Sequence, residues 1–202
     1  MHKELKEKYL EWLKKEHHAH QDLYHELAFQ GAKPTAFFIS CCDSRVVSNQ
    51  IFNAKIGDHF IHRNIANLVP SFKNAQANTA TYASIEFAIK NLEIRQIFIL
   101  GHSQCAGINA LMHFDQKDPE LQFVNRWLEQ DQARIDLKDR CHSNEELEKE
   151  SIKLSMHHLL NYPAISDLKN KNEINIAGLW IDIASGRLEI CSEYEDPFVS
   201  LV

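Results

Sequence analysis

Three short apolar runs constrain the fold of this chain more than any other feature. The segments TAFFIS (residues 35–40) and QIFIL (96–100) are almost entirely apolar, and HFIHR (59–63) alternates more strongly. A strand that is apolar on both faces is typical of a parallel sheet covered by helices. We therefore predict that these runs are strands of one mainly parallel sheet.

The segments around these runs have the apolar spacing of helices. Residues 2–29 predict one or two amphipathic helices, and residues 106–160 are mostly helical with a polar connection around 137–145. Residues 74–93 predict a further helix with one apolar stripe, formed by Ile85, Ala88, Ile89 and Leu92.

A second pair of strands is predicted near the C-terminus. Residues 174–191 read as two strands joined by a turn at Ser185-Gly186, which we expect at an antiparallel edge of the sheet. The predicted fold class is α/β, with a mainly parallel central sheet flanked by helices and an N-terminal helical arm. We expect a single domain over residues 1–202, divided into the arm (1–30), a core that contains the reactive motifs (34–110) and a region of helices and edge strands (111–202).

Composition narrows the classes of partner. The chain has a net charge of −6, so it lacks the excess of basic residues that binding to nucleic acid or to an anionic membrane requires. No apolar run is long enough to span a bilayer. The charged N-terminus lacks the apolar segment of a signal peptide, so we predict a cytoplasmic protein. Five cysteines, an odd number, favour reduced thiols or metal ligation over a disulfide framework.

Two of the predicted strands are followed directly by reactive side chains. FISCCDSR continues the first run, and GHSQCAG follows QIFIL, with His102 and Cys105 three positions apart. Reactive groups of α/β sheets gather where strands end, so these segments are expected to meet. A Cys, His, Cys set with an open fourth position is typical of catalytic zinc.

The alternation of an extended chain selects one cysteine of the Cys41–Cys42 pair. Side chains at positions i and i+2 share a side, so Cys41 faces the same way as Asp43, and Cys42 is expected to turn away into packing. We predict that Arg45 holds Asp43 in a two-point ion pair and keeps this carboxylate off the metal. Asp43 is then free to orient a metal-bound water.

These motifs together resemble the β-class carbonic anhydrases. The pattern Cys-x-Asp-Ser-Arg after an apolar strand, then HRNIAN, SIEFAI and GHSQCAG, is in register from about residue 34 to 110. The resemblance implies one Zn²⁺ per chain, held by Cys41, His102 and Cys105. It implies Asp43 and Arg45 as the catalytic dyad, and reversible hydration of carbon dioxide to bicarbonate and a proton by zinc-bound hydroxide.

The resemblance also implies a substrate pocket and an assembly. Phe60, Ile65 and Phe87 match the family's apolar pocket, although many members have tyrosine in place of Phe87. Phe38 replaces a tryptophan of the allosteric members, so the chain is more similar to the open subgroup. The family forms homodimers or dimers of dimers, in which an N-terminal helix packs over the neighbouring subunit. A helix packed on its own domain is an equal alternative for residues 2–29.

Three other functions are compatible with parts of the pattern. The same zinc site is suited to hydrolysis of carbon disulfide or carbonyl sulfide, where access decides the substrate. A cysteine-nucleophile phosphatase or sulfurtransferase would use Cys41 or Cys42 with Arg45 as the anion ligand, but CCDSRV lacks the glycines of a phosphate-binding loop. A non-enzymatic zinc module would need Asp43 as a fourth ligand.

Overall fold

A computed structural model describes residues 2–201 of the chain, which divide into two compact units between Lys33 and Pro34. The first unit is helical, as predicted. Its elements are α1 (Lys3–Trp12), a π-helical turn (Leu13–His17), a 3₁₀ turn (His18–His20) and α2 (Gln21–Gln30). No helix in the described part of the chain is long and apolar enough to cross a membrane.

The second unit is built on a six-stranded sheet with the order β2-β1-β3-β4-β5-β6. Neighbouring strands are parallel from β2 to β4, and β5 and β6 add an antiparallel edge. This arrangement confirms the predicted fold class, and β6 is the one strand of the sheet that was not predicted. The strands are β1 (Ala36–Cys41), β2 (His59–Asn64), β3 (Gln96–His102), β4 (Asn175–Ile181), β5 (Leu188–Cys191) and β6 (Val199–Ser200).

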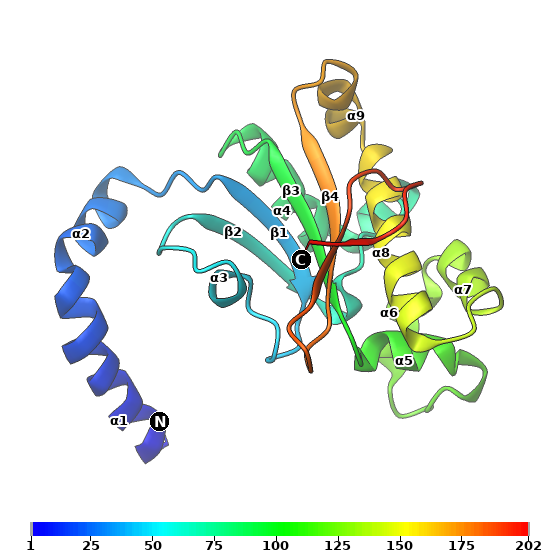
Figure 1. Ribbon diagram of the computed structural model, residues 1–202, viewed down its shortest axis with the longest axis horizontal. Helices are drawn as coiled ribbons and strands as arrows, with labels where there is room; N and C mark the ends of the chain where they lie inside the picture. The colour runs from blue at the N-terminus through cyan, green and yellow to red at the C-terminus, as the bar shows by residue number, and fades with distance from the viewer. Residues whose placement is uncertain (1, 202) are drawn as a thin grey trace. The chain divides into compact units, whose positions relative to one another are not determined.

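Seven α-helices of the second unit connect and flank the strands (Figure 1). They are α3 (Ser48–Ile51), α4 (Thr79–Lys90), α5 (Ala106–Met112), α6 (Gln122–Glu129), α7 (Gln132–Lys138), α8 (Asn144–Leu160) and α9 (Pro163–Asn170). The predicted helix over 74–93 is α4, preceded by a 3₁₀ segment at Phe72–Asn78. The predicted helical region 106–160 is four helices, and its polar connection separates α7 from α8.

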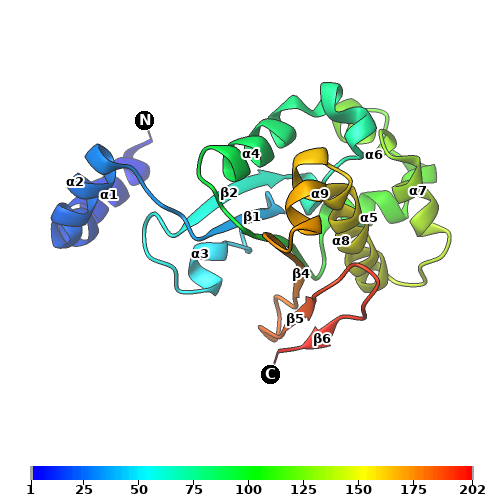
Figure 2. The same cartoon turned by 90° about the horizontal axis from the view of Figure 1, so that it is seen from above.

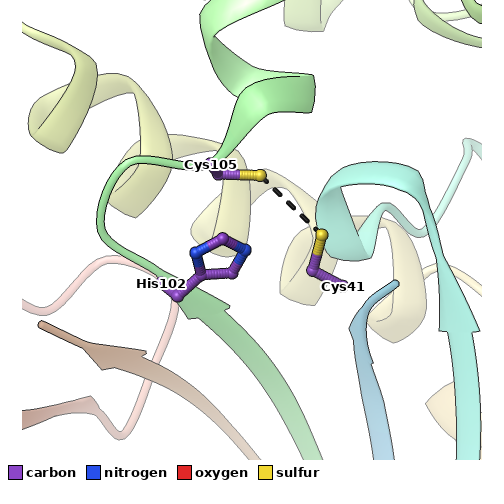
Figure 3. Close-up of side chains that lie close together, drawn as sticks. All are labelled: Cys41, His102 and Cys105. Carbon is purple, nitrogen blue, oxygen red and sulfur yellow. Dashed lines mark hydrogen bonds between the residues drawn. The ribbon is translucent and has the colours of Figure 1, made fainter. Parts of the chain in front are cut away.

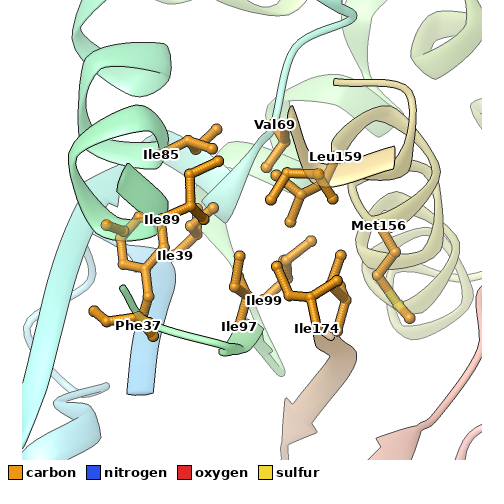
Figure 4. Packing of buried hydrophobic residues seen from close by; sticks show 14 of the residues in the cluster. Phe37, Ile39, Val69, Ile85, Ile89, Ile97, Ile99, Met156, Leu159 and Ile174 are labelled. Atoms are coloured by element: carbon orange, nitrogen blue, oxygen red, sulfur yellow. The ribbon is translucent and has the colours of Figure 1, made fainter. Parts of the chain in front are cut away.

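Helices cover the two faces of the sheet unequally. Figure 2 shows α4, α8 and α9 over one face and the short α3 on the opposite side. The alternation of β1 divides its side chains accordingly, since Phe37 and Ile39 join the cluster under α4 and α8 whereas Phe38 contacts Phe52 beside α3. Figure 4 shows this main core between α4 and α8. Each large apolar side chain buried there stabilises the fold by about 1.5–3 kcal/mol.

A second apolar cluster lies at the carboxyl ends of the parallel strands. It joins α5, α6, α7 and α8 to the loop after β2, and Cys41 and Cys105 belong to it. Gly107 in α5 lies so close to this loop that an added Cβ would be 2.8 Å from Ile65 Cγ2 and 2.9 Å from Ala66 Cβ. Ala66 itself has a left-handed backbone, with φ of 64°. The carboxyl end of the sheet is therefore closely packed.

Candidate metal centre

Cys41, His102 and Cys105 meet at the carboxyl ends of two neighbouring strands. Cys41 ends β1, His102 ends β3, and Cys105 immediately precedes α5 (Figure 3). Their ligand atoms all lie within 4.8 Å of one another, and the two sulfur atoms are 3.8 Å apart. Two thiolates on one tetrahedral zinc, with bonds of about 2.3 Å, have a sulfur separation of about 3.8 Å. The geometry therefore fits zinc.

The imidazole of His102 is fully buried and has a fixed tautomer. Its Nδ1–H donates to the carbonyl oxygen of Ser103 at 2.9 Å, which leaves Nε2 as the atom with a free lone pair. Nε2 is buried and has no hydrogen-bond partner among the described residues. A buried nitrogen lone pair beside two thiols is an unsatisfied ligand, and a metal ion satisfies it.

The two thiols are not equivalent in acidity. The hydrogen bond between the two thiols lowers the pKa of Cys41 well below its usual value against the effect of burial, and the backbone amides of Asp43 and Ala66 lower it further. The pKa of Cys105 is raised by the same hydrogen bond with Cys41 and by burial. Cys41 is thus the ready thiolate, and Cys105 releases its proton when a metal binds.

Asp43 lies beside the three ligands and is held by Arg45, as the sequence predicted. Arg45 Nε donates to Asp43 Oδ1 at 2.9 Å, and Nη2 donates to Oδ2 at 2.7 Å. Arg45 lowers the pKa of Asp43 strongly, so the carboxylate stays ionised. Its Oδ2 is 3.9 Å from Nε2 of His102. A hydrogen-bond acceptor therefore faces the ligand cluster.

Cys42 points away from the ligands, but the prediction that it packs in the interior is wrong. Its side chain is exposed, and its backbone N–H donates to the carbonyl oxygen of Asn64. The reason is that β1 ends at Cys41, so the next side chain lies beyond the layer that covers the sheet.

Arg63 is a supporting residue that the sequence analysis missed. From the end of β2 its guanidinium donates to three backbone carbonyl oxygens: that of Cys41 at the end of β1 at 2.9 Å, and those of Asp43 at 2.7 Å and Val46 at 2.9 Å in the loop that follows. One guanidinium thereby ties the backbone of a ligand to the backbone of the neighbouring carboxylate. Arg63 is the last residue of the predicted strand 59–63, and this position at a strand end is the feature from which its supporting role could have been predicted.

Ser103 connects His102 to the turn after β4. Its hydroxyl donates to Asp182 Oδ1 at 3.0 Å and accepts the backbone N–H of Ile183 at 2.9 Å. Because the carbonyl of Ser103 holds the imidazole of His102, this anchor fixes the ring orientation. No sequence pattern linked Ser103 to a residue 79 positions away.

The three predicted pocket residues lie in two places. Ile65 follows β2 and contacts Gly107 near the ligand cluster. In the pairing of β1 with β2, Cys41 is opposite Asn64. Phe60 is opposite Phe37, so it lies four residues along β2 from the position beside Cys41. Phe87 is 47% exposed, with its ring centroid 5.8 Å from that of Phe60. The assignment of all three to a substrate pocket stays a prediction.

Comparison with known proteins identifies many relatives of one kind. A family model described as carbonic anhydrase matches residues 36–188. The chain is 32% identical over 181 residues to beta carbonic anhydrase 3 of Arabidopsis thaliana, which covers 83% of this chain and 68% of the relative. It spans between 56% and 68% of the length of five curated carbonic anhydrases that it matches.

Solved structures agree with the fold. The β-carbonic anhydrase CcaA superposes with a TM-score of 0.90 at 28% identity, over 98% of this chain and 91% of that chain. One of two tetrameric β-carbonic anhydrases from the ascomycete Sordaria macrospora has a TM-score of 0.76 at 24% identity, over 91% of this chain and 93% of that chain. At that identity the second likeness concerns the fold alone.

Proposed function

Since the chain belongs to the β-carbonic anhydrase family, we propose that it catalyses the reversible hydration of carbon dioxide to bicarbonate and a proton, with one zinc ion per chain. The observation that carries the proposal is the cluster of Cys41, His102 and Cys105 beside a carboxylate that Arg45 restrains. Three protein ligands leave the fourth position of a tetrahedral ion open for a reacting molecule.

Each polar residue of the site has a separate task in this proposal. Zinc held by the three ligands supplies the acidification of a water molecule that makes it a nucleophile near neutral pH. Asp43 Oδ2 accepts a hydrogen bond from the reacting water and orients it toward the substrate carbon. Arg45 occupies both carboxylate oxygens of Asp43, so this side chain acts as an acceptor and does not ligate the metal.

The surroundings of the cluster suit a nonpolar gas. Cys41 and Cys105 are embedded among buried apolar side chains that include Ala66, Leu68 and Ile108. A dry wall favours carbon dioxide over water and strengthens the electrostatic interactions at the polar end. We assign Ile65 to this wall, and Phe60 and Phe87 to the substrate pocket that the family pattern implies.

The other candidate functions receive less support from the contacts. A thiol nucleophile would need the guanidinium of Arg45 for its anionic substrate, but this guanidinium is already paired with Asp43 and also donates to the carbonyl oxygen of Gln104. A closed structural zinc site would need Asp43 as the fourth ligand, which the same pair opposes. Hydrolysis of carbonyl sulfide or carbon disulfide would use the same centre. The assay of carbon dioxide hydration should therefore be accompanied by assays of both other substrates.

The decisive experiment combines metal analysis with stopped-flow carbon dioxide hydration. We expect about one zinc per wild-type chain, and loss of both zinc and activity in Cys41→Ser. Cys42→Ser is the matched control, because it alters the adjacent thiol that points to solvent, and it should keep both. Loss of zinc in Cys42→Ser with retention in Cys41→Ser would show that the assigned ligand is wrong.

We also propose that the protein is a homodimer or a dimer of dimers in the cytoplasm. Strand β2 is an edge of the sheet, and Phe52, Ile56 and Ile61 near this edge are each more than a third exposed. Exposed apolar groups along an edge strand are typical of an interface. The five unpaired cysteines fit a reducing compartment. Light scattering tests the assembly, and fractionation of cells tests the location.

A further inference from the structure

Glu148 of α8 is a buried carboxylate that the proposed chemistry does not use. It is 3% exposed, and it forms no ion pair with a lysine, arginine or histidine of residues 2–201. Both of its oxygens are nonetheless occupied. Oε1 accepts the backbone N–H of Cys105 at 3.0 Å, and Oε2 accepts the indole N–H of Trp180 at 2.9 Å. One carboxylate therefore connects a metal ligand to the interior of the sheet.

The indole that holds the far end of Glu148 cannot readily move. Trp180 lies on β4, where it is opposite Gly101 of β3, and it is 1% exposed. The ammonium group of Lys149 lies 4.2 Å from the centroid of its ring and covers it. Glu148 is thus fixed by its own helix and by a rigid donor on a central strand.

The backbone that Glu148 reaches is under strain. Gln104, the residue before Cys105, has a φ of 55°, which places a non-glycine residue in the left-handed region. Such a conformation persists only where neighbouring contacts enforce it. The hydrogen bond from the Cys105 N–H to Glu148 is one contact directly after the strained residue, and it also satisfies a buried donor.

We propose that Glu148 is a positioning residue of the metal centre: by accepting hydrogen bonds from Cys105 and Trp180, it holds the Cys105 thiol in place relative to Cys41 and His102. This inference rests on the zinc binding proposed above. Both groups that face Glu148 are donors, so the site requires an acceptor at each end. A glutamine has one oxygen and one NH₂ group, and would present a donor to one of the two N–H groups.

The test measures how tightly zinc is held, with carbon dioxide hydration only as a supplement. Zinc transfer to a colorimetric chelator is followed for wild type, Glu148→Gln and Glu145→Gln. The last variant is a matched control, because Glu145 lies on the same helix, pairs with Lys149 and is half exposed. The same proteins are loaded with Co²⁺, and their thiolate-to-metal absorption is recorded as a signature of ligand geometry. Circular dichroism reports folding.

We expect Glu148→Gln to release zinc about tenfold faster or more, in line with the effect of residues that orient metal ligands, and to shift the cobalt spectrum. Glu145→Gln should match wild type in both. Release and spectrum of Glu148→Gln equal to those of Glu145→Gln would overturn the positioning role. If wild type itself binds no zinc, the proposed cofactor fails and the positioning role falls with it, which is a distinct result.

A second comparison removes the indole donor and remains informative if Glu148→Gln alone does not fold. In Trp180→Phe the far donor is absent, so a glutamine can turn its oxygen toward Cys105 and serve as well as glutamate. The double variant Glu148→Gln/Trp180→Phe should therefore release zinc at a rate close to that of Trp180→Phe. A double variant that releases zinc about tenfold faster than Trp180→Phe would refute the hydrogen-bond argument.

Discussion

Replacing Gly107 by alanine tests the tight contact between α5 and the loop after β2. The new Cβ would lie 2.8 Å from Ile65 Cγ2, 2.9 Å from Ala66 Cβ and 3.3 Å from Ala66 N. Ile65 is 40% exposed and has room to turn aside, but Ala66 is fully buried and its Cβ is fixed by the backbone. The strain therefore falls on Ala66, whose amide favours the thiolate of Cys41.

The size of the effect follows from two opposing terms. Overpacking of this kind costs about 1–3 kcal/mol, and the exchange of glycine for alanine inside a helix returns about 0.5–1 kcal/mol. We expect Gly107→Ala to lower the free energy of unfolding by about 1–2 kcal/mol and to weaken zinc binding, because Ala66 and Cys41 are displaced together.

Urea unfolding and zinc release to a chelator measure the two effects. Ala66→Gly supplies the matched rescue, since it deletes the Cβ in conflict and suits the φ of 64°. On its own this change is nearly neutral, because relief of the left-handed strain offsets the loss of one buried methyl group. The double variant should regain most of the lost stability and zinc retention. Gly107→Ala with wild-type stability, or a double variant less stable than Gly107→Ala, would refute the reasoning.

Three other substitutions test separate parts of the structure. Asp43→Asn should keep zinc and lose most carbon dioxide hydration in a stopped-flow assay, because the amide no longer offers two acceptor oxygens; full activity would remove Asp43 from the mechanism. Burial lowers the pKa of His62 below 6.5, so on acidification the unfolded chain takes up a proton at this residue before the folded chain does. The stability that the neutral imidazole contributes is therefore complete above pH 6.5 and is lost as the pH falls. His62→Gln should flatten the decline of the free energy of unfolding, measured by urea titration between pH 7.5 and 5.5, by up to about 1.4 kcal/mol per pH unit, and an unchanged slope contradicts this. Arg134 is 1% exposed and donates to Ser151 and Ser155. Arg134→Leu should lower the free energy of unfolding by about 3–5 kcal/mol, because the buried carboxylate of Asp131 loses its cation. A loss below about 1 kcal/mol in denaturant unfolding would argue against a charged pair.

The parallel strands could be predicted because burial on both faces leaves a compositional mark. TAFFIS and QIFIL are almost entirely apolar for this reason, and they form most of β1 and β3. Strand β6 has only two residues and depends on pairing with β5, so no local sequence pattern predicts it. The breaks between α5, α6 and α7 were missed, although residues 113–121 are mostly polar and contain Pro119. These helices have only 7, 8 and 7 residues, which is too short for the apolar spacing to mark their ends.

The ligand cluster was predictable because its members are rare residue types at strand ends. Cys41, His102 and Cys105 belong to this class, and the alternation of the chain separated Cys41 from Cys42. Arg63 and Glu148 were missed because arginine and glutamate are common on surfaces, and what distinguishes them here is a partner that is 22 or 43 positions away in the sequence. Only the pairing of β1 with β2 and the packing of α8 bring those partners together.

The placement of the candidate ligands at the end of β1, at the end of β3 and just before α5 bears on how zinc would be acquired in the proposed function. Cys41 and Cys105 are 64 positions apart, and the intervening chain must cross over to make the two strands parallel. The complete ligand set therefore comes into existence only after this slow, long-range strand pairing has formed. An ion bound at that point would close a long loop. A cross-link over such a span lowers the conformational entropy of the unfolded chain, which stabilises the folded state by about 4 kcal/mol in the loop-entropy treatment. In the proposed function zinc would therefore bind late in folding, and its removal should lower the stability of the folded protein.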